Sequence, residues 1–251
     1  MNMTGNTILV TGATSGIGRA LAEAFHDRGN TVVVTGRRTS HLEAITADRP
    51  AITGIILDIG DGEAVAACAR DVGERFPDLN IVLANAGISR TEDMSAQDWN
   101  ASDAQAIVDT NILGVIRTAT AFLPLLRQRR DATFLATSSN LAFIPRADFP
   151  TYCASKAFLH SWLQSLRHQL RHVPVEVLEL APPYVRTELT GTGQASDERA
   201  MALDVYVAEV IDILERQAHP AGEILVERDR ARRFAERDGR YEETFAAMNP
   251  N

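Results

Sequence analysis

The residues best suited to chemistry in this sequence are a tyrosine and a lysine four positions apart. Tyr152 and Lys156 lie in the stretch TYCASKAF, and a helix there would place both side chains on one face, one turn apart. A free tyrosine has a pKa of about 10 and is a poor acid or base near neutral pH. A neighbouring ammonium favours the phenolate. The pair is therefore suited to proton transfer, although many surface helices carry a Tyr and a Lys at this spacing by chance.

Strand-like and helix-like segments alternate along the sequence and predict the fold that positions these side chains. Short runs of aliphatic and β-branched residues occur at 7–11, 31–35, 52–58, 80–84, 132–138, 175–180 and 223–226. Segments with helical patterning lie between them, for example 17–28, 63–75, 104–128, 152–171 and 199–217. Strands that are apolar on both faces are typical of a parallel sheet covered by helices. The alternation predicts one α/β domain over residues 1–251, with a doubly wound parallel sheet of about seven strands and helices on both faces.

A glycine-rich turn follows the first predicted strand. Gly12, Gly16 and Gly18 stand in TGATSGIGRALAEAF, where the strand would bend into the first helix. Glycine permits a tight turn and lets backbone and helix N-terminus approach a phosphate without a clash at Cβ. Three glycines can also serve turn geometry alone. Their place at the start of a β–α series favours a dinucleotide phosphate site.

The second predicted strand ends in VVVTGRR, with Arg37 and Arg38 and no acidic residue. NAD sites usually place Asp or Glu near this point to bond the ribose, whereas an arginine accommodates the 2′-phosphate of NADP. A guanidinium can hold that phosphate with two parallel hydrogen bonds. Two solvated arginines after a strand are also common. We predict NADP(H) as the cofactor.

Five motifs occur together and in register. They are TGATSGIG at 11–18, LANAG at 83–87, Asn111 in TNILG, Ser139 in TSS, and Tyr152 with Lys156. Together they resemble the short-chain dehydrogenase/reductase family, and LAPPYVRTEL with SLRHQLR resembles its DltE-like branch of oxidoreductases. The resemblance implies a single-domain Rossmann-like fold and an NADP(H)-dependent ketone or aldehyde reductase, or alcohol dehydrogenase, with a tyrosine as general acid and base.

The resemblance also implies a role for individual positions. Asn111, Ser139, Tyr152 and Lys156 match the catalytic tetrad. In it the tyrosine exchanges a proton with the substrate oxygen, the serine binds that oxygen, the lysine holds the nicotinamide ribose, and the asparagine anchors a water. The positions that match cofactor-binding residues are Gly12, Thr14, Ser15, Gly16, Ile17, Gly18, Arg37, Arg38, Asp58, Ile59, Asn85, Ala86, Gly87, Tyr152, Lys156, Pro182, Val185 and Thr187.

Two departures from the family pattern concern the substrate and the nicotinamide. The stretch SSNLA lacks the glycine that often follows the catalytic serine, so this loop is expected to hold substrate differently. Pro183 stands where the family has the glycine of a Pro-Gly turn. Proline removes a backbone N–H and fixes φ, so any nicotinamide contact made through that glycine is altered. We expect a mobile lid at about 184–205. We expect the opposite wall, at 142–150, to be lined by Phe143, Ile144 and Phe149.

Charge and composition limit which partners, compartment and metals we expect for the protein. The formal net charge of −8 argues against nucleic-acid or anionic-membrane partners. We find no apolar segment long enough for a bilayer and no charged leader with a cleavage site, so a cytoplasmic protein is expected. Cys68 and Cys153 lack metal-ligand spacing, and no carboxylate motif joins His160, His168 and His172, so no metal is predicted.

The sequence also bears on how the protein assembles and on which other functions it could have. The charged stretch 228–251 is expected to form one or two helices that cap the sheet edge or contact another subunit. The family commonly forms homodimers or homotetramers through helices matching 104–128 and 152–171. A redox-sensing regulator that binds NADP(H) without turnover is the main alternative, and a scaffold that uses the C-terminal helices is another. The complete tetrad favours an enzyme, and the three residues between Tyr152 and Lys156 favour carbonyl over enoyl reduction.

Overall fold

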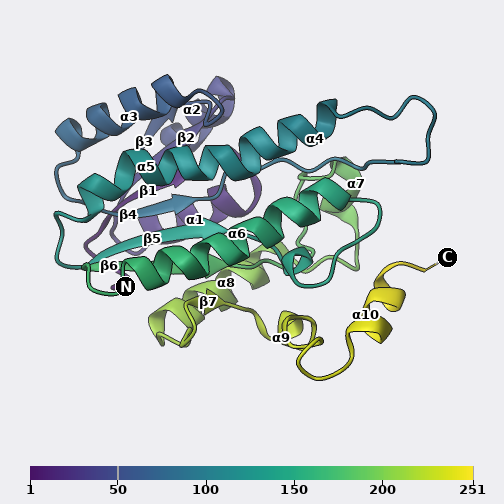
Figure 1. The fold of residues 1–251 in the computed structure, drawn as a ribbon. Coiled ribbons are helices and arrows are strands. Elements are labelled where there is room, and N and C mark those ends of the chain that lie inside the picture. The colour runs from purple at the N-terminus through teal and green to yellow at the C-terminus, as the bar shows by residue number, and fades with distance from the viewer. Residues whose placement is uncertain (50, 251) are drawn as a thin grey trace.

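One parallel sheet of seven strands organises the protein (Figure 1). The computed structural model describes residues 1–49 and 51–250. The strands lie in the order β3-β2-β1-β4-β5-β6-β7. They are β1 (Thr7–Thr11), β2 (Thr31–Gly36), β3 (Ile52–Ile56), β4 (Leu79–Ala84), β5 (Ala132–Thr137), β6 (Val175–Leu180) and β7 (Glu223–Ile224). The chain winds outward in opposite directions from β1 and β4, so a crevice opens at their carboxyl ends, where ligands bind in such sheets. The predicted fold class is confirmed.

Helices cover both faces of the sheet (Figure 1). One face carries α1 (Gly16–His26), α2 (Thr39–Asp48) and α8 (Leu203–Glu215), and the other carries α3 (Gly62–Arg75), α5 (Gly114–Leu126) and α6 (Pro150–Gln169). Successive strand residues point to opposite faces. Ile8 and Val10 of β1 therefore join the apolar cluster under α1 and α8, whereas Leu9 joins the cluster under α3 and α5. This explains why the strand sequences are apolar at consecutive positions.

A long apolar helix runs from Ser102 to Leu126. It consists of α4 (Ser102–Ile107), a π-helical turn η1 (Val108–Leu113) and α5. By length and composition alone this helix could cross a membrane, which corrects the expectation that no such segment exists. Val115, Ala119 and Phe122 are buried in the cluster that α5 shares with β4 and β5. Its apolar composition is thus that of a helix packed in a core.

Two helices form the charged C-terminal stretch, α9 (Glu227–Arg233) and α10 (Tyr241–Met248). Arg233 of α9 forms an ion pair with Glu223 of β7 at 2.7 Å, so α9 covers the edge of the sheet. α9 also packs against η2 (Asn140–Ala142), a 3₁₀ turn that follows β5. α10 buries none of its residues and extends from the body of the molecule (Figure 1).

Candidate active site

A cavity of about 470 Å³ lies over the carboxyl ends of β1 and β4. It is lined by every position that the sequence assigned to cofactor binding, and also by Ser139. Asn111 is not among the lining residues and is fully buried. Motifs that are separated by up to about 170 positions in the sequence therefore meet around one space.

The glycine turn has the backbone geometry expected of a phosphate cradle. Gly12 and Gly16 have φ angles of 65° and 56°, a region that residues with a Cβ rarely adopt. A Cβ at Gly12 would lie 2.5 Å from Cα of Ala86, so the turn packs directly on the segment after β4. The side chain of Ser15, the N-cap of α1, makes no capping hydrogen bond. The first N–H groups of α1 thus remain available to phosphate oxygens.

Asn85 joins the ends of three strands beneath the cavity. Its Nδ2 donates to the carbonyl oxygens of Thr11 and Gly12, each at 3.3 Å. Its Oδ1 accepts a hydrogen bond from Thr137 Oγ1 at 3.2 Å. β1, β4 and β5 are therefore fixed relative to one another where their ends border the cavity.

Two arginines stand at the glycine-turn end of the cavity. Arg38 Nη2 donates to Thr14 Oγ1 at 2.7 Å and to Ser15 Oγ at 2.6 Å. Arg37 Nη1 lies 3.6 Å from Asp58 Oδ2, and both of these side chains are more than half exposed. An exposed ion pair of this kind contributes little stability. The Arg37 guanidinium can therefore turn towards an anionic ligand at small cost.

α6 places Tyr152 and Lys156 side by side, one helical turn apart. The Lys156 Nζ lies 5.6 Å from the centroid of the Tyr152 ring and donates to the carbonyl oxygen of Thr137 at 2.8 Å. Both side chains are buried. Burial raises the pKa of Tyr152 to about 12, against the effect of a hydrogen bond with Ser139. Burial lowers the pKa of Lys156 to about 8, against the attraction of Glu179. Desolvation, rather than the ammonium of Lys156, thus dominates the pKa of Tyr152 in the protein alone.

Asn111 sits in η1 and uses its whole amide within the protein. Its Oδ1 accepts from the N–H of Ile88 at 2.9 Å, and its Nδ2 donates to Ile88 O at 2.9 Å and to Ser155 Oγ at 3.1 Å. These bonds tie the long helix to α6 and to the segment after β4. π-helical turns often occur at functional sites. The side chain of Asn111 therefore braces the site from behind.

The two serines after β5 have different partners. Ser139 is the N-cap of η2, and its Oγ accepts from the N–H of Leu141 at 3.1 Å. Ser138 Oγ donates to the carboxylate of Glu179. Of the two, Ser139 is the one that interacts with Tyr152. This arrangement supports the sequence-based choice of Ser139 over Ser138.

Part of the segment expected to form a lid lines the cavity. α7 (Thr192–Ser196) lies within it, and Gln194 Nε2 donates to Val185 O at 2.7 Å and to Thr187 Oγ1 at 3.1 Å. Gln194 also lines the cavity, as do Pro182 and Pro183. The mobility of the lid stays a prediction.

The expected apolar wall is wrong. Phe143, Ile144 and Phe149 are not among the residues that line the cavity. Ile144 is buried, and Phe143 packs edge-on against His160 with 5.1 Å between ring centroids. Phe149 packs beside Arg146, whose guanidinium carbon lies 5.7 Å from the ring centroid.

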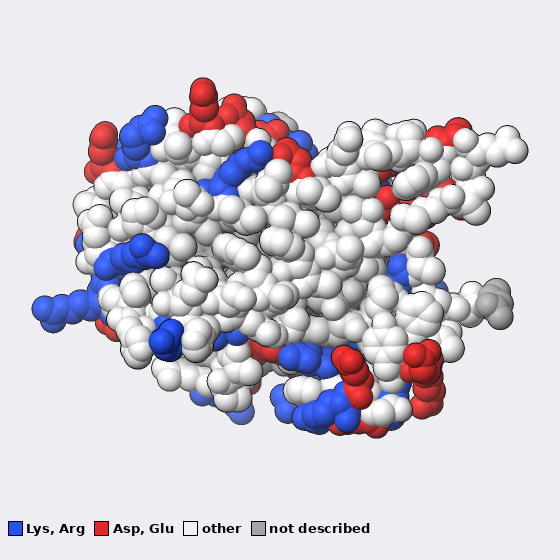
Figure 2. All heavy atoms as spheres, viewed as in Figure 1, with Lys and Arg blue, Asp and Glu red and all other residues white. Residues whose placement is uncertain are grey.

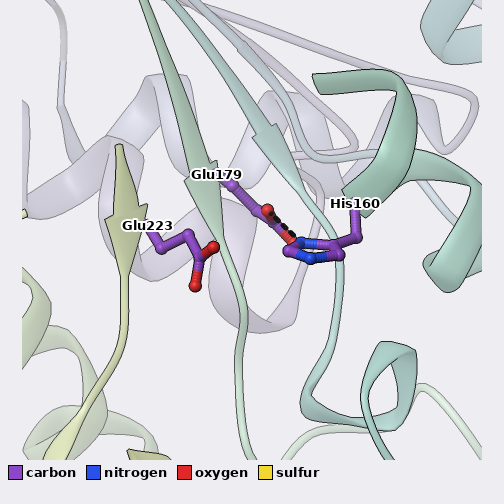
Figure 3. Close-up of side chains that lie close together, drawn as sticks. All are labelled: His160, Glu179 and Glu223. Carbon is purple, nitrogen blue, oxygen red and sulfur yellow. Dashed lines mark hydrogen bonds and ion pairs between the residues drawn. The ribbon is translucent and has the colours of Figure 1, made fainter. Parts of the chain in front are cut away.

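Two acidic residues near the site carry no recognisable motif. Glu92 accepts hydrogen bonds from the N–H of Thr151 at 3.0 Å and from its Oγ1 at 2.9 Å, and so holds the first turn of α6. Glu179 pairs with His160 Nδ1 at 2.8 Å, and Glu223 lies beside them (Figure 3). The fold thus brings carboxylates to His160 although no sequence motif joins them, and the expected absence of a metal stays a prediction. These contacts cannot be predicted from the spacing of residues in the sequence, because each joins segments far apart in the chain.

Comparison with known proteins agrees with this fold. A family model for short chain dehydrogenases matches residues 6–198. An oxidoreductase of Bacillus subtilis named DltE is 34% identical over 99% of this chain and 98% of its own. A sulfoacetaldehyde reductase of Chromohalobacter salexigens is 35% identical over 77% of this chain and 78% of its own.

Two solved short-chain dehydrogenases have the same fold. One, from Burkholderia cenocepacia in complex with NADP, superposes with a TM-score of 0.82, 24% identity and full coverage of both chains, at 100% each. The other, from Burkholderia phymatum in complex with NAD, gives a TM-score of 0.81 at 22% identity, over 100% of this chain and 98% of its own. The protein belongs to the short-chain dehydrogenase/reductase family of oxidoreductases.

Proposed function

We propose that this protein is an NADP(H)-dependent reductase of ketones or aldehydes that also runs in reverse on secondary alcohols. The observation that carries the proposal is the shared cavity. Ser139, Tyr152 and Lys156 line the space that the glycine turn and the two arginines close at its other end. The arginines would hold the 2′-phosphate, the glycine turn the pyrophosphate and Lys156 the nicotinamide ribose, so the residues present fit this cofactor.

NADPH, when bound, would supply a hydride to the carbonyl carbon. Tyr152 gives its phenolic proton to the carbonyl oxygen as negative charge develops there, which completes the alcohol. Ser139 donates a hydrogen bond to the same oxygen. Lys156 would hold the ribose hydroxyls, and its ammonium would stabilise the phenolate that remains on Tyr152. Asn111 keeps α6 and the segment after β4 in register behind these groups.

The choice of NADP(H) over NAD(H) rests on Arg37 and Arg38. Arg38 lies against Thr14 and Ser15 at the turn, where its charge would attract the 2′-phosphate, and Arg37 can leave its exposed pair with Asp58 at small cost. The segment from Gly36 to Arg38 contains no acid that would repel the phosphate. Asp58 remains available to the adenine.

For the substrate we infer a small carbonyl compound that carries an anionic group. Arg90 lines the same cavity as the Tyr–Lys pair, and its guanidinium donates to Ser89 O at 2.8 Å. Within residues 1–49 and 51–250, Arg90 forms no ion pair. The similarity to a sulfoacetaldehyde reductase supports the same class, since its substrate carries a sulfonate.

A panel of carbonyl compounds tests the proposal, with charged and neutral members of equal size and with both cofactors. Nicotinamide absorbance reports turnover. We expect NADPH-dependent reduction, fastest for the anionic members. Tight NADPH binding without turnover on any member would instead support the redox-sensing regulator.

We also infer that the protein forms a homodimer or homotetramer through α5 and α6. Figure 2 shows few charged side chains over this face. The exposed side chains of Val108, Leu113 and Phe158 lie on these helices or at their start. Sedimentation equilibrium tests this, and a monomer at micromolar concentration would contradict it.

A further inference from the structure

Behind the serine loop lies a carboxylate that is fully buried. Glu179, near the end of β6, has no exposed surface. Its Oε1 accepts a hydrogen bond from Ser138 Oγ, and its Oε2 pairs with His160 Nδ1 at 2.8 Å (Figure 3). An ionised carboxylate is costly to bury unless it is paired and hydrogen-bonded. Both oxygens of Glu179 meet this condition, and one of the two bonds holds the residue next to Ser139.

His160, Glu179 and Glu223 lie close enough to suggest metal ligands, but each is already engaged. Glu223 accepts two hydrogen bonds from Arg233, at 2.7 and 2.9 Å. The Nε2 of His160 lies 2.8 Å from Gln164 Nε2, which can only donate, so the proton of the ring is on Nδ1 and faces Glu179. The guanidinium of Arg233 supplies the positive charge that a metal ion would otherwise bring to these carboxylates. The group is therefore a closed network of ion pairs and hydrogen bonds.

Ionisable groups from three elements face Glu179. They are Lys156, His160 and Arg167 of α6, Glu223 of β7 and Arg233 of α9. Lys156 is the one among them that lines the cavity. Attraction to the Glu179 carboxylate raises the pKa of Lys156 and so opposes the effect of burial. Glu179 thus acts on the candidate reaction centre in two ways, by a hydrogen bond with Ser138 and by electrostatic attraction to Lys156.

We propose that Glu179 is a positioning residue of the active site. Its carboxylate holds Ser138, and with it the strand end that carries Ser139. Lys156 Nζ bonds the carbonyl oxygen of Thr137 at the same strand end, and the charge of Glu179 favours its ammonium form. His160 keeps the carboxylate oriented. The effect on turnover rests on the proposed function, whereas the effect on Lys156 does not.

Lys156 is the only lysine in the sequence, since the other 24 of its 25 basic Lys and Arg residues are arginines. Labelling with [ε-¹³C]lysine therefore gives a single side-chain signal whose pH titration reports Lys156. We expect a midpoint of about 8 in the wild-type protein, and a midpoint lower by about one pH unit in Glu179→Gln.

Glu223→Gln is the matched control. It removes a second carboxylate from the same cluster, one that is partly buried and contacts Arg233 rather than Ser138. We expect its Lys156 midpoint to match the wild-type value. A Glu179→Gln midpoint equal to that of wild type, or an equal shift in both variants, would overturn the charge role of Glu179.

Turnover tests the positioning role. We expect Ser138→Ala to lower kcat about tenfold or more with little change in KM or in the Lys156 midpoint, because Ser139 loses its restraint while the charge remains. Unchanged kcat in Ser138→Ala would overturn this role, and this small substitution decides it even if Glu179→Gln fails to fold. If the wild-type protein turns over no carbonyl compound, the proposed function fails, while the lysine titration still decides the charge role.

Discussion

Asp229 of α9 is buried, and its carboxylate accepts a hydrogen bond at only one of its two oxygens in the described part of the chain. Its Oδ1 accepts from Asn140 Nδ2 at 2.8 Å, and its Oδ2 has no hydrogen-bond partner in the described part of the chain. Arg232 Nη1 lies 3.9 Å away, and the Asp229 side chain is 2% exposed. Burial raises the pKa of Asp229 to about 6, in spite of the hydrogen bond and the neighbouring arginines. The ionised side chain is therefore a cost to the folded state at neutral pH.

The size of this cost follows from the two pKa values. The usual value is 3.8 and the folded value is about 6, a difference of about 2 units, which corresponds to about 3 kcal/mol. Because the folded pKa is the higher one, the contribution of protonated Asp229 to stability is complete below about pH 4. It is lost as the pH rises towards about 6. Asp229→Asn keeps an oxygen for Asn140 and has no charge to desolvate. We expect this variant to unfold with a free energy about 3 kcal/mol higher at pH 7.5, and only about 1 kcal/mol higher at pH 4.5.

Urea unfolding followed by circular dichroism at both pH values measures the difference. Asp78→Asn serves as the control, since Asp78 is 90% exposed and its change should leave the free energy of unfolding nearly unaltered. The reasoning is refuted if the gain of Asp229→Asn is the same at both pH values, or if that variant is less stable than wild type at pH 7.5.

Three predictions concern the proposed chemistry. Tyr152→Phe should lower kcat at least about a thousandfold while the NADPH dissociation constant from fluorescence titration stays within about twofold, and retained turnover would defeat the mechanism. Arg37→Asp should weaken NADPH and favour NADH, because a carboxylate repels the 2′-phosphate; equal affinities of the wild-type protein for both cofactors would refute the NADP assignment. Reductive kcat should fall as the pH rises through about 8, because Lys156 carries its positive charge below that pKa and loses it above; a flat profile to pH 9.5 would exclude a role for that charge.

The parts of the site that the sequence predicts are those with local chemical requirements. Gly12 and Gly16 adopt positive φ angles that nearly demand glycine, so the turn leaves a mark in the sequence. Tyr152 and Lys156 need only the spacing of one helical turn. The strands are apolar at successive positions because helices cover both faces of the sheet, so this part of the fold can also be predicted from the sequence.

The parts that the sequence misses depend on contacts across the chain. Glu92, Glu179 and Asp229 bond residues 59, 41 and 89 positions away, and an isolated acidic residue looks the same in the sequence whether it is solvated or buried. The apolar stretch at 142–150 misleads for a related reason. Its aromatic side chains suggest a pocket wall, but the direction of a side chain after a 3₁₀ turn is set by packing, here of Phe143 on His160.

The missing glycine after Ser139 has a structural explanation in the same contacts. Asn140 stands at that bend, and its N–H donates to Pro182 O at 2.9 Å while its side chain donates to Asp229. Ser138 on the other side is held by Glu179. Bonds from β6, α9 and the Pro-Pro turn thus fix a loop from outside, whereas a glycine there would leave it freer to change conformation. A loop restrained in this way is preorganised, so α9 supports the loop of the candidate active site as well as covering the sheet edge.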